Sequence, residues 1–361
     1  MNDKEQSIFN LIKKDPYISQ QDLADTMGLS RSSIANLISG LVKKGYIRGK
    51  AYVVNDLKQI VCIGGANIDR KFYVKDKLQM GTSNPIYSAQ NPGGVARNIA
   101  ENLGRLGLDI TLLTVSGVDQ GWEYIAEQSD PYMNLGEVTH FSKESTGSYT
   151  AVLDEAGDLV LGLADMDIFD LMIPEWIQQH VPILNQAKCI LADLNCPQET
   201  LQFLCKFAKS HAIPLILVTV SAPKMKHIPD QLDGITWIIT NHEESEAYFN
   251  RKLKHQESAR MWLEQGVENV VVTKGRDGAV IGNNEGEIHP VPAIKTDKII
   301  DVTGAGDAFS SAVTHAWLEG YSLQNIAKAG IVNATKTLQS PYTVRRDLSA
   351  IQLQEDTEAQ S

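Results

Sequence analysis

Residues 60–65 read Ile60-Val61-Cys62-Ile63-Gly64-Gly65, an uninterrupted apolar run that ends in two glycines. This pattern is typical of a buried strand that ends in a tight turn. Similar apolar runs recur along the chain with helical stretches between them, at residues 110–115, 189–192, 215–218, 237–240 and 270–273. The alternation predicts an α/β fold, in which a mostly parallel sheet lies between layers of helices.

Residues 136–165 interrupt this alternation. Two strand-like segments, 147–154 and 158–164, are joined by the turn Glu155-Ala156-Gly157, which predicts an antiparallel flap. A half-exposed flap beside an α/β body suits the role of a lid, and its free face suits pairing with a second subunit. We therefore expect a homodimer formed through this β lid.

The first 54 residues follow a different pattern. Apolar residues recur at helical spacing in three stretches, about 8–12, 23–27 and 34–42, and Ser19 and Ser30 are placed to cap the second and third helices. Two short alternating segments on either side of Gly49-Lys50 predict a hairpin. The whole segment resembles an all-α winged helix-turn-helix domain of bacteria, with the hairpin as its wing.

This resemblance implies that the third helix faces DNA with four polar residues, namely Arg31, Ser32, Ser33 and Asn36. Basic residues near the phosphate backbone would be Lys43, Lys44, Arg48 and Lys50. Residues 1–54 hold eight Lys or Arg and five Asp or Glu, a net charge of +3, so their electrostatic attraction to DNA is weak. A three-helix module used for dimerisation is the alternative.

Composition and charge limit what the rest of the chain can be. Of 361 residues, 43% are hydrophobic and 21% are charged, which is typical of a globular protein with a large core. The residues after 54 carry a net charge of −14, which argues against general affinity for nucleic acid. Four cysteines without metal-ligand spacing predict reduced, mostly buried thiols, and the absence of a signal peptide or apolar span predicts a cytoplasmic protein that does not enter a membrane.

The segment Asp301-Val302-Thr303-Gly304-Ala305-Gly306-Asp307, followed by a helical pattern to Leu318, carries the clearest chemistry. Small residues at a helix start leave the backbone N–H groups of Gly304, Ala305 and Gly306 free to hold a transferred phosphoryl group. Asp307 in the first turn can take the proton from an attacking hydroxyl. The plainer alternative is a glycine turn in which Asp307 only caps the helix.

With this segment, residues 64–69 and 92–100 resemble the paired N-terminal and C-terminal motifs of the PfkB, or ribokinase-like, carbohydrate kinase family. The resemblance implies a ribokinase-like α/β/α sandwich with a small β lid, and ATP and Mg²⁺ as its cofactors. The implied division of the chain is a winged helix-turn-helix domain at 1–56, a kinase domain at 57–350 with the lid at about 66–90 and 136–165, and a polar tail at 351–361. We expect that tail to be frayed after Leu353.

The first motif pair is the family's substrate site, and its residues here suit a ligand with several hydroxyl groups. Asn67 and Asp69 can bind sugar hydroxyls, Gly93 and Gly94 allow close approach of the backbone, and Asn98 adds a donor and an acceptor. Asp69 could instead be a turn or salt-bridge carboxylate, with Arg70 or Lys71 as its partner.

The family resemblance also implies a nucleotide site. Asn241 and Glu244 resemble the family motif that organises Mg²⁺ through water, although an exposed acid at a helix start is the alternative. Lys274-Gly275-Arg276-Asp277-Gly278 resembles the nucleotide loop, with Lys274, Gly275 and Gly278 toward the phosphates, and Asn333 would close over adenine. Asp301 and Thr303, with carbonyls around residues 334–340, would hold a monovalent cation, K⁺.

Residues 93–103 and 164–169 are more similar to pseudouridine kinases than to ribokinases or fructokinases. This implies phosphorylation of the ribose 5′-hydroxyl of pseudouridine, with Ser148 and Thr150 of the flap at the uracil edge. A ribokinase-like or fructokinase-like sugar kinase, or another nucleoside kinase, is the main alternative. A transcription regulator whose body senses a nucleoside is a second, which the candidate base Asp307 disfavours.

Overall fold

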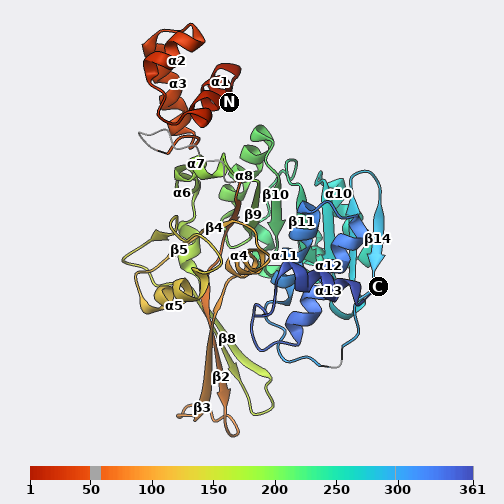
Figure 1. The fold of residues 1–361 in the computed structure, drawn as a ribbon. Coiled ribbons are helices and arrows are strands. Elements are labelled where there is room, and N and C mark those ends of the chain that lie inside the picture. Colours follow the sequence, from red (N-terminus) through yellow and green to blue (C-terminus); the bar gives the residue numbers. More distant parts are fainter. Residues whose placement is uncertain (49–57, 297, 361) are drawn as a thin grey trace.

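The computed structural model describes residues 1–48, 58–296 and 298–360 (Figure 1). The N-terminal head contains α1 (Asp3–Lys14), α2 (Gln20–Met27) and α3 (Arg31–Lys43). The predicted caps are confirmed, since Ser19 accepts a hydrogen bond from the N–H of Asp22 and Ser30 accepts one from Ser33. The three helices bury a small core of their own that includes Ile8, Ile12, Leu23, Ile34 and Leu41. The predicted wing depends on residues 49–54, which lie outside the described ranges.

The main sheet has eight strands in the order β14-β13-β12-β11-β10-β9-β1-β4. Its parallel part consists of the six predicted runs: β1 (Ile60–Ile63), β4 (Ile110–Leu113), β9 (Cys189–Asp193), β10 (Leu215–Val218), β11 (Trp237–Asn241) and β12 (Asn269–Thr273). An antiparallel hairpin of β13 (Ala279–Asn283) and β14 (Ile288–Val291) completes one edge. The carboxyl ends of the parallel strands therefore meet at one edge of the sheet.

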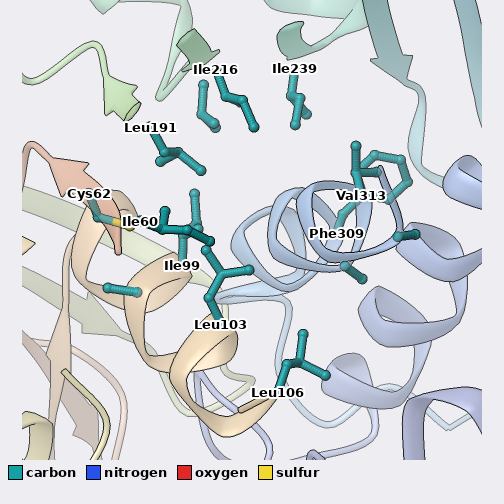
Figure 2. Packing of buried hydrophobic residues seen from close by; sticks show 14 of the residues in the cluster. Ile60, Cys62, Ile99, Leu103, Leu106, Leu191, Ile216, Ile239, Phe309 and Val313 are labelled. Carbon is teal, nitrogen blue, oxygen red and sulfur yellow. The ribbon is translucent and has the colours of Figure 1, made fainter. Parts of the chain in front are cut away.

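Helices cover both faces of this sheet, as the prediction of an α/β/α sandwich requires. Ile60 and Cys62 of β1 join the core under α4 (Val95–Arg105), α11 (Ala305–Leu318) and α12 (Leu323–Leu338), and Figure 2 shows this packing. Val61 and Ile63 point the other way, into the core that holds residues of α6 (Pro174–Gln179), α8 (Gln198–His211) and α10 (His255–Glu264). Successive side chains of β1 thus point to opposite faces of the sheet and enter the two cores in turn.

A four-stranded lid extends from this body (Figure 1) and has the order β3-β2-β7-β8. The predicted flap is confirmed as the antiparallel pair β7 (Ser148–Leu153) and β8 (Leu159–Asp165). It is joined by β2 (Asn67–Val74), which pairs in parallel with β7, and by β3 (Ile86–Gly93). The short strands β5 (Val115–Ser116) and β6 (Thr139–His140) and the helix α5 (Gln120–Ser129) complete this region.

The C-terminal segment is a helix, so the expectation of a frayed tail is wrong for the residues up to 358. Helix α13 (Ala350–Glu358) begins with the side chain of Ser349 accepting a hydrogen bond from the N–H of Gln352. It buries Leu353 and Asp356. The Asp356 carboxylate accepts a hydrogen bond from Arg345 at 2.6 Å, and this ion pair ties α13 to the body.

The four cysteines, Cys62, Cys189, Cys196 and Cys205, are free and buried, as predicted. Burial raises the thiol pKa of each, to about 12 for Cys189 and Cys205. Such thiols are protonated and inert at neutral pH. Across the described part of the chain, no helix combines the length and the apolar character needed to cross a bilayer.

Candidate functional site

Asp307 lies in the first turn of α11 and faces Asn98 of α4. Asn98 Nδ2 donates a hydrogen bond of 2.8 Å to Asp307 Oδ2. These two predicted site residues are 209 positions apart in the sequence, so the packing of α11 against α4 brings them together. Asp307 is surrounded by protein atoms yet keeps part of its surface open to solvent.

The surroundings of Asp307 give it an unusual acidity. Burial raises its pKa from 3.8 to about 7, and the nearby carboxylates of Asp193 and Asp69 act in the same direction. The hydrogen bond from Asn98 opposes these effects. A carboxylate with a pKa near 7 can accept a proton at neutral pH more effectively than an ordinary aspartate.

The glycine turn before α11 has the geometry of an anion site. Gly304 has a φ of 82°, and a Cβ there would lie 2.1 Å from the carbonyl oxygen of Thr343, so glycine is required. A Cβ on Gly306 would meet nothing within 4 Å, so space is open beside the turn. The helix begins at Ala305, and the N–H groups of its first turn have no acceptor within the helix. The turn thus offers donors and a helix dipole to an anion.

The substrate residues predicted from the first motif pair lie together at the base of the lid. Asn67 Nδ2 donates to Asp69 Oδ1 at 2.7 Å, and a Cβ on Gly93 would come within 2.3 Å of the Asp69 carboxylate. Gly94 has a φ of 99°, and a Cβ there would lie 2.3 Å from the carbonyl oxygen of Gly65. Burial raises the pKa of Asp69, while the hydrogen bond from Asn67 and the charges of Lys71 and Arg97 lower it.

Asp193 directly follows the predicted strand 189–192, and it is a site residue that was not predicted from the sequence. Its side chain is fully buried and accepts hydrogen bonds from the N–H groups of Gly65, Ala96 and Asn195 at 2.8–3.0 Å. A Cβ on Gly64 would collide with the same carboxylate. Asp193 therefore fixes the loop after β1 against the start of α4, and so positions both halves of the substrate motif.

Arg97 and Glu101 of α4 were also missed. Arg97 is 1% exposed and pairs with Glu101 at 2.5 Å. Arg97 Nη1 donates to Asn98 Oδ1 at 3.1 Å, which turns the amide so that its Nδ2 faces Asp307. Consecutive residues on a helix rarely signal such a contact in sequence, because they point about 100° apart.

Asp301 and Thr303 are close together, as predicted, but the group that they bind is a lysine. Lys71 Nζ of β2 lies 2.5 Å from Asp301 Oδ2 and 3.0 Å from Thr303 Oγ1. Thr303 also donates its N–H and hydroxyl to Asp301 Oδ1 at 2.9 and 2.7 Å. The ammonium group thus contacts both residues that were predicted to bind a monovalent cation.

Ser148 and Thr150 lie on the face of the lid opposite to Asp69, so the strand register does not support the prediction that they contact the uracil edge. In the parallel pairing of β2 with β7, Ile68 lies beside Ser148 and Asp69 beside Tyr149. Ser148 therefore shares the opposite face with Ile68 and lines a cavity of about 430 Å³ there. Tyr149 occupies the Asp69 face instead, which only the strand register could reveal.

Asn241 and Glu244 form the start of α9 (His242–Phe249) at the carboxyl end of β11. They form a reciprocal capping box, in which each side chain accepts the N–H of the other residue, at 2.8 and 3.1 Å. Glu244 is 5% exposed and also accepts the hydroxyls of Thr219 and Thr240. The alternative of an exposed acid is wrong, and the proposed role with Mg²⁺ stays a prediction.

The predicted nucleotide loop follows β12, whose Thr273 pairs with Asn241 of β11. Lys274 is partly exposed and lies 3.4 Å from Asp277. Gly275 and Gly278 have φ values of 49° and 85°, and a Cβ on Gly278 would lie 2.1 Å from the carbonyl oxygen of Val291. The loop and Glu244 therefore share the same edge of the sheet, and their contact with a nucleotide stays a prediction.

Asn333 cannot close over adenine, because its side chain is 0% exposed and bonded inside the protein. Its Nδ2 donates to the carbonyl oxygen of Ala308 at 2.9 Å, and its Oδ1 accepts from Arg345 at 3.0 Å. Arg345 in turn pairs with Asp356 of α13. Asn333 is therefore a structural link between α11, α12 and the C-terminal segment.

The DNA-binding candidates lie on α3, where Arg31, Ser32 and Asn36 are exposed and Ser33 is half-buried. Ser33 donates its N–H to Ser30 and so helps to cap the helix. Lys44 pairs with Glu5 of α1 at 2.8 Å, which ties its charge to the head itself. Three of the four candidates are thus fully accessible on α3, and their contact with DNA stays a prediction.

Comparisons with known proteins divide the chain in two. The sequence profile of the pfkB family of carbohydrate kinases matches residues 57–349. A profile described as winged helix-turn-helix DNA-binding matches residues 1–48. The two matches correspond to the body with its lid and to the head.

Individual relatives match either nearly the whole chain or most of it. The uncharacterized sugar kinase YeiI of Escherichia coli (strain K12) is 28% identical over 353 residues, covering 94% of this chain and 96% of the relative. The pseudouridine kinase of the same organism is 31% identical over 295 residues, covering 80% and 93%. A solved carbohydrate kinase from Agrobacterium tumefaciens superposes with a TM-score of 0.74 at 30% identity, covering 84% and 97%.

Proposed function

The chain belongs to the pfkB family of carbohydrate kinases, as a phosphotransferase with an alcohol acceptor, and we propose that it phosphorylates the ribose 5′-hydroxyl of pseudouridine. In this reaction ATP gives up its γ-phosphoryl group, and the products are pseudouridine 5′-phosphate and ADP. The proposal has two parts: the chemistry at Asp307, and the identity of the acceptor.

The position and acidity of Asp307 support the chemistry. It lies beside the open glycine turn, and its pKa of about 7 leaves a large fraction ionised at neutral pH. Asp307 takes the proton of the acceptor hydroxyl as its oxygen attacks the γ-phosphorus, and ADP leaves. The N–H groups of Gly304, Ala305 and Gly306 then stabilise the charge on the transferred group.

The residues at the ends of β11 and β12 fit a nucleotide carried with Mg²⁺, which would neutralise phosphate charge. Lys274 can contact the phosphates, and Gly275 and Gly278 let the backbone approach them. Glu244 Oε1 accepts no hydrogen bond from the residues that the structure describes, so it is free to bind a metal-bound water. Magnesium commonly binds through one carboxylate, several waters and substrate phosphates.

The choice of pseudouridine depends on similarity to the pseudouridine kinase of Escherichia coli. The pair Asn67 and Asp69 supports any acceptor with neighbouring hydroxyls, so ribose, fructose and other nucleosides remain competitors. A coupled assay of ADP release with pseudouridine, uridine, ribose and fructose separates them. We expect the highest kcat/KM for pseudouridine, and a preference for a free sugar would overturn the assignment.

A single substitution tests the role of Asp307 as the general base. Asp307→Asn keeps the size of the side chain and removes the base, so turnover should be lost while the substrate still binds in isothermal titration. Turnover equal to that of the wild type would show that another group takes the proton.

We further propose that the head binds DNA, because its profile match is joined to an exposed polar face on α3. Binding of the full chain to the DNA upstream of its own gene should weaken as salt increases. Arg31→Ala should weaken binding, whereas Lys4→Ala, which removes an exposed charge from α1, should not. Absence of any salt-dependent binding would favour a role of the head in assembly.

We also propose a homodimer formed through the lid. All seven residues of β8 are exposed, among them Leu159, Val160, Leu161 and Leu163. In the described part of the lid, β8 pairs on one side only, so its other edge offers free backbone groups. An exposed apolar edge strand favours pairing with a second copy.

A further inference from the structure

Lys71 brings a positive charge from the lid to the loop that precedes Asp307. Its ammonium group bonds to Asp301 Oδ2 and Thr303 Oγ1, which belong to the two residues expected to hold K⁺. The side chains of Lys71 and Asp301 are 19% and 24% exposed, so the pair is largely shielded from water. An ion pair in such surroundings is screened less by salt than a surface pair.

The carbonyl oxygens of Thr337 and Leu338, which belong to the range expected to complete a cation site, accept hydrogen bonds within the protein. The Leu338 oxygen accepts the N–H groups of Ile300 and Asp301 at 2.8 and 3.4 Å. The Thr337 oxygen accepts the N–H of Ser340 at 2.9 Å. The hydrogen bonds to the Leu338 oxygen join the end of α12 to the loop that contains Asp301.

The strand register delivers Lys71 to this position. Asp69 and Lys71 are two residues apart on β2, so they share the face that looks toward α11. The residues beside Lys71 on the neighbouring strands are Ala89 of β3 and Ala151 of β7. Short side chains on both sides leave the long lysine side chain free to reach across to Asp301.

The charge balance of the site also favours a fixed cation there. Asp69, Asp193 and Asp307 are close enough to influence one another, and Asp301 adds a further carboxylate. Lys71 Nζ lies 2.5 Å from Asp301 Oδ2, so the ammonium group is the direct counter-ion of this carboxylate.

We propose that the Lys71 ammonium group replaces a monovalent cation beside the phosphoryl-transfer loop, so that this kinase needs no K⁺. K⁺ does not fit the residues as they stand, because the side chains of both residues expected to bind it already bind Lys71. The same contact ties the lid to the catalytic loop. Its kinetic consequences rest on the proposed kinase reaction, whereas the occupancy of the site does not.

Thermal unfolding tests the occupancy without any substrate. The wild type should have the same Tm in potassium chloride and in tetramethylammonium chloride at equal ionic strength. Lys71→Ala should have a lower Tm in tetramethylammonium chloride and regain part of it in potassium chloride, because K⁺ can enter the emptied site. Lys75→Ala removes an exposed lysine just beyond β2 and should behave like the wild type.

Two results would overturn the proposal. The first is a wild-type Tm that K⁺ raises as much as it raises that of Lys71→Ala, since the ion would then bind beside the lysine. The second is a variant that gains no response to K⁺, since the position would then be no cation site. Lys71→Met keeps the aliphatic chain and replaces Lys71→Ala if that variant fails to fold.

Kinetics then test the role in catalysis. Wild-type turnover should be equal in the two salts, whereas Lys71→Ala should be slower by about 10- to 100-fold in tetramethylammonium chloride and faster in potassium chloride. Lys75→Ala again serves as the control. If the wild type phosphorylates no nucleoside or sugar, the proposed function fails, and the Tm comparison still decides whether Lys71 occupies the site.

Discussion

The surroundings of Asp307 raise its pKa, which suits a general base. The same surroundings make its ionised form unfavourable, which lowers the stability of the folded protein. Burial, Asp193 and Asp69 all make its negative charge costly, and only the amide of Asn98 donates a hydrogen bond to it among the described residues. Arg97 orients that amide and adds a distant positive charge. Single substitutions in this group should therefore move the pH dependence of the reaction in directions that can be stated in advance.

Removing the Asn98 amide should shift the reaction toward higher pH. The hydrogen bond stabilises the ionised carboxylate, so Asn98→Ala should raise the pKa of Asp307 above about 7. Because the base works when deprotonated, the acidic limb of kcat should move to higher pH. Asp69→Asn removes a neighbouring negative charge and should move the limb to lower pH. ADP release measured from pH 5 to 9 gives the acidic limb of kcat for the wild type, Asn98→Ala and Asp69→Asn. Limbs at the same pH in all three proteins would contradict this account.

Asp307→Asn should lower kcat and raise the free energy of unfolding. The folded-state pKa of about 7 is higher than the ordinary value of 3.8, so Asp307 lowers stability as pH rises from about 4 to about 7. At pH 8 the variant should lose about 10²- to 10⁴-fold in kcat and gain on the order of 1 kcal/mol in unfolding free energy. Its advantage in Tm should shrink at pH 5. A variant less stable than the wild type at pH 8 would show that the ionised Asp307 carboxylate does not destabilise the folded protein.

At the scale of elements, the C-terminal helix α13 is joined to the catalytic helices by a short chain of polar contacts. Asp356 binds Arg345, Arg345 binds Asn333, and Asn333 binds the Ala308 carbonyl oxygen in the turn after Asp307. All three side chains are buried, with exposures of 7, 2 and 0%. The position of α11 therefore depends on a segment that has no direct contact with the proposed substrate.

Arg345→Ala should destabilise the protein by about 3 kcal/mol, because it leaves Asp356 and Asn333 buried with fewer partners. Urea unfolding followed by circular dichroism measures this. Arg346→Ala is the matched control, since Arg346 is the exposed neighbour whose guanidinium lies over the ring of Tyr342. Equal stabilities of the two variants would show that the buried chain contributes little.

The lid edge should determine the oligomeric state. Leu161→Asp places a charge in the middle of β8, and charges on an edge strand oppose pairing with another chain. We expect the proposed dimer to dissociate into monomers in analytical ultracentrifugation. Ala156→Asp, in the exposed turn between β7 and β8, is the control and should stay dimeric. A dimer that persists in Leu161→Asp would show that the subunit interface is not formed by β8.

At the scale of the whole molecule, the sequence was most informative where the pattern is local. The six parallel strands, the helix caps at Ser19 and Ser30, and the flap follow from apolar runs and turn residues, and the structure confirms them. The pairing of β7 with β2 does not follow from local pattern, so the sequence could not show that Ser148 and Thr150 lie on the face opposite to Asp69. A shift of one residue in a strand exchanges its two faces.

Contacts between residues that are far apart in the sequence could not be predicted either. Lys71 and Asp301 are 230 residues apart, and nothing local in either segment indicates that they bind each other. The family pattern marked Asp301 and Thr303 as a cation site, and the structure supplies the cation from the lid. Asn333 was likewise assigned from its position in a motif, whereas the packing of α12 against α11 buries it.

The buried cysteines have a practical consequence for following the lid in solution. Since Cys62, Cys189, Cys196 and Cys205 are enclosed and protonated, a maleimide dye should leave the native chain unmodified. A single new thiol at Ser88, which is exposed on β3, would then carry the only label. Its fluorescence would report how the lid moves as ligands bind, without removing any natural cysteine first.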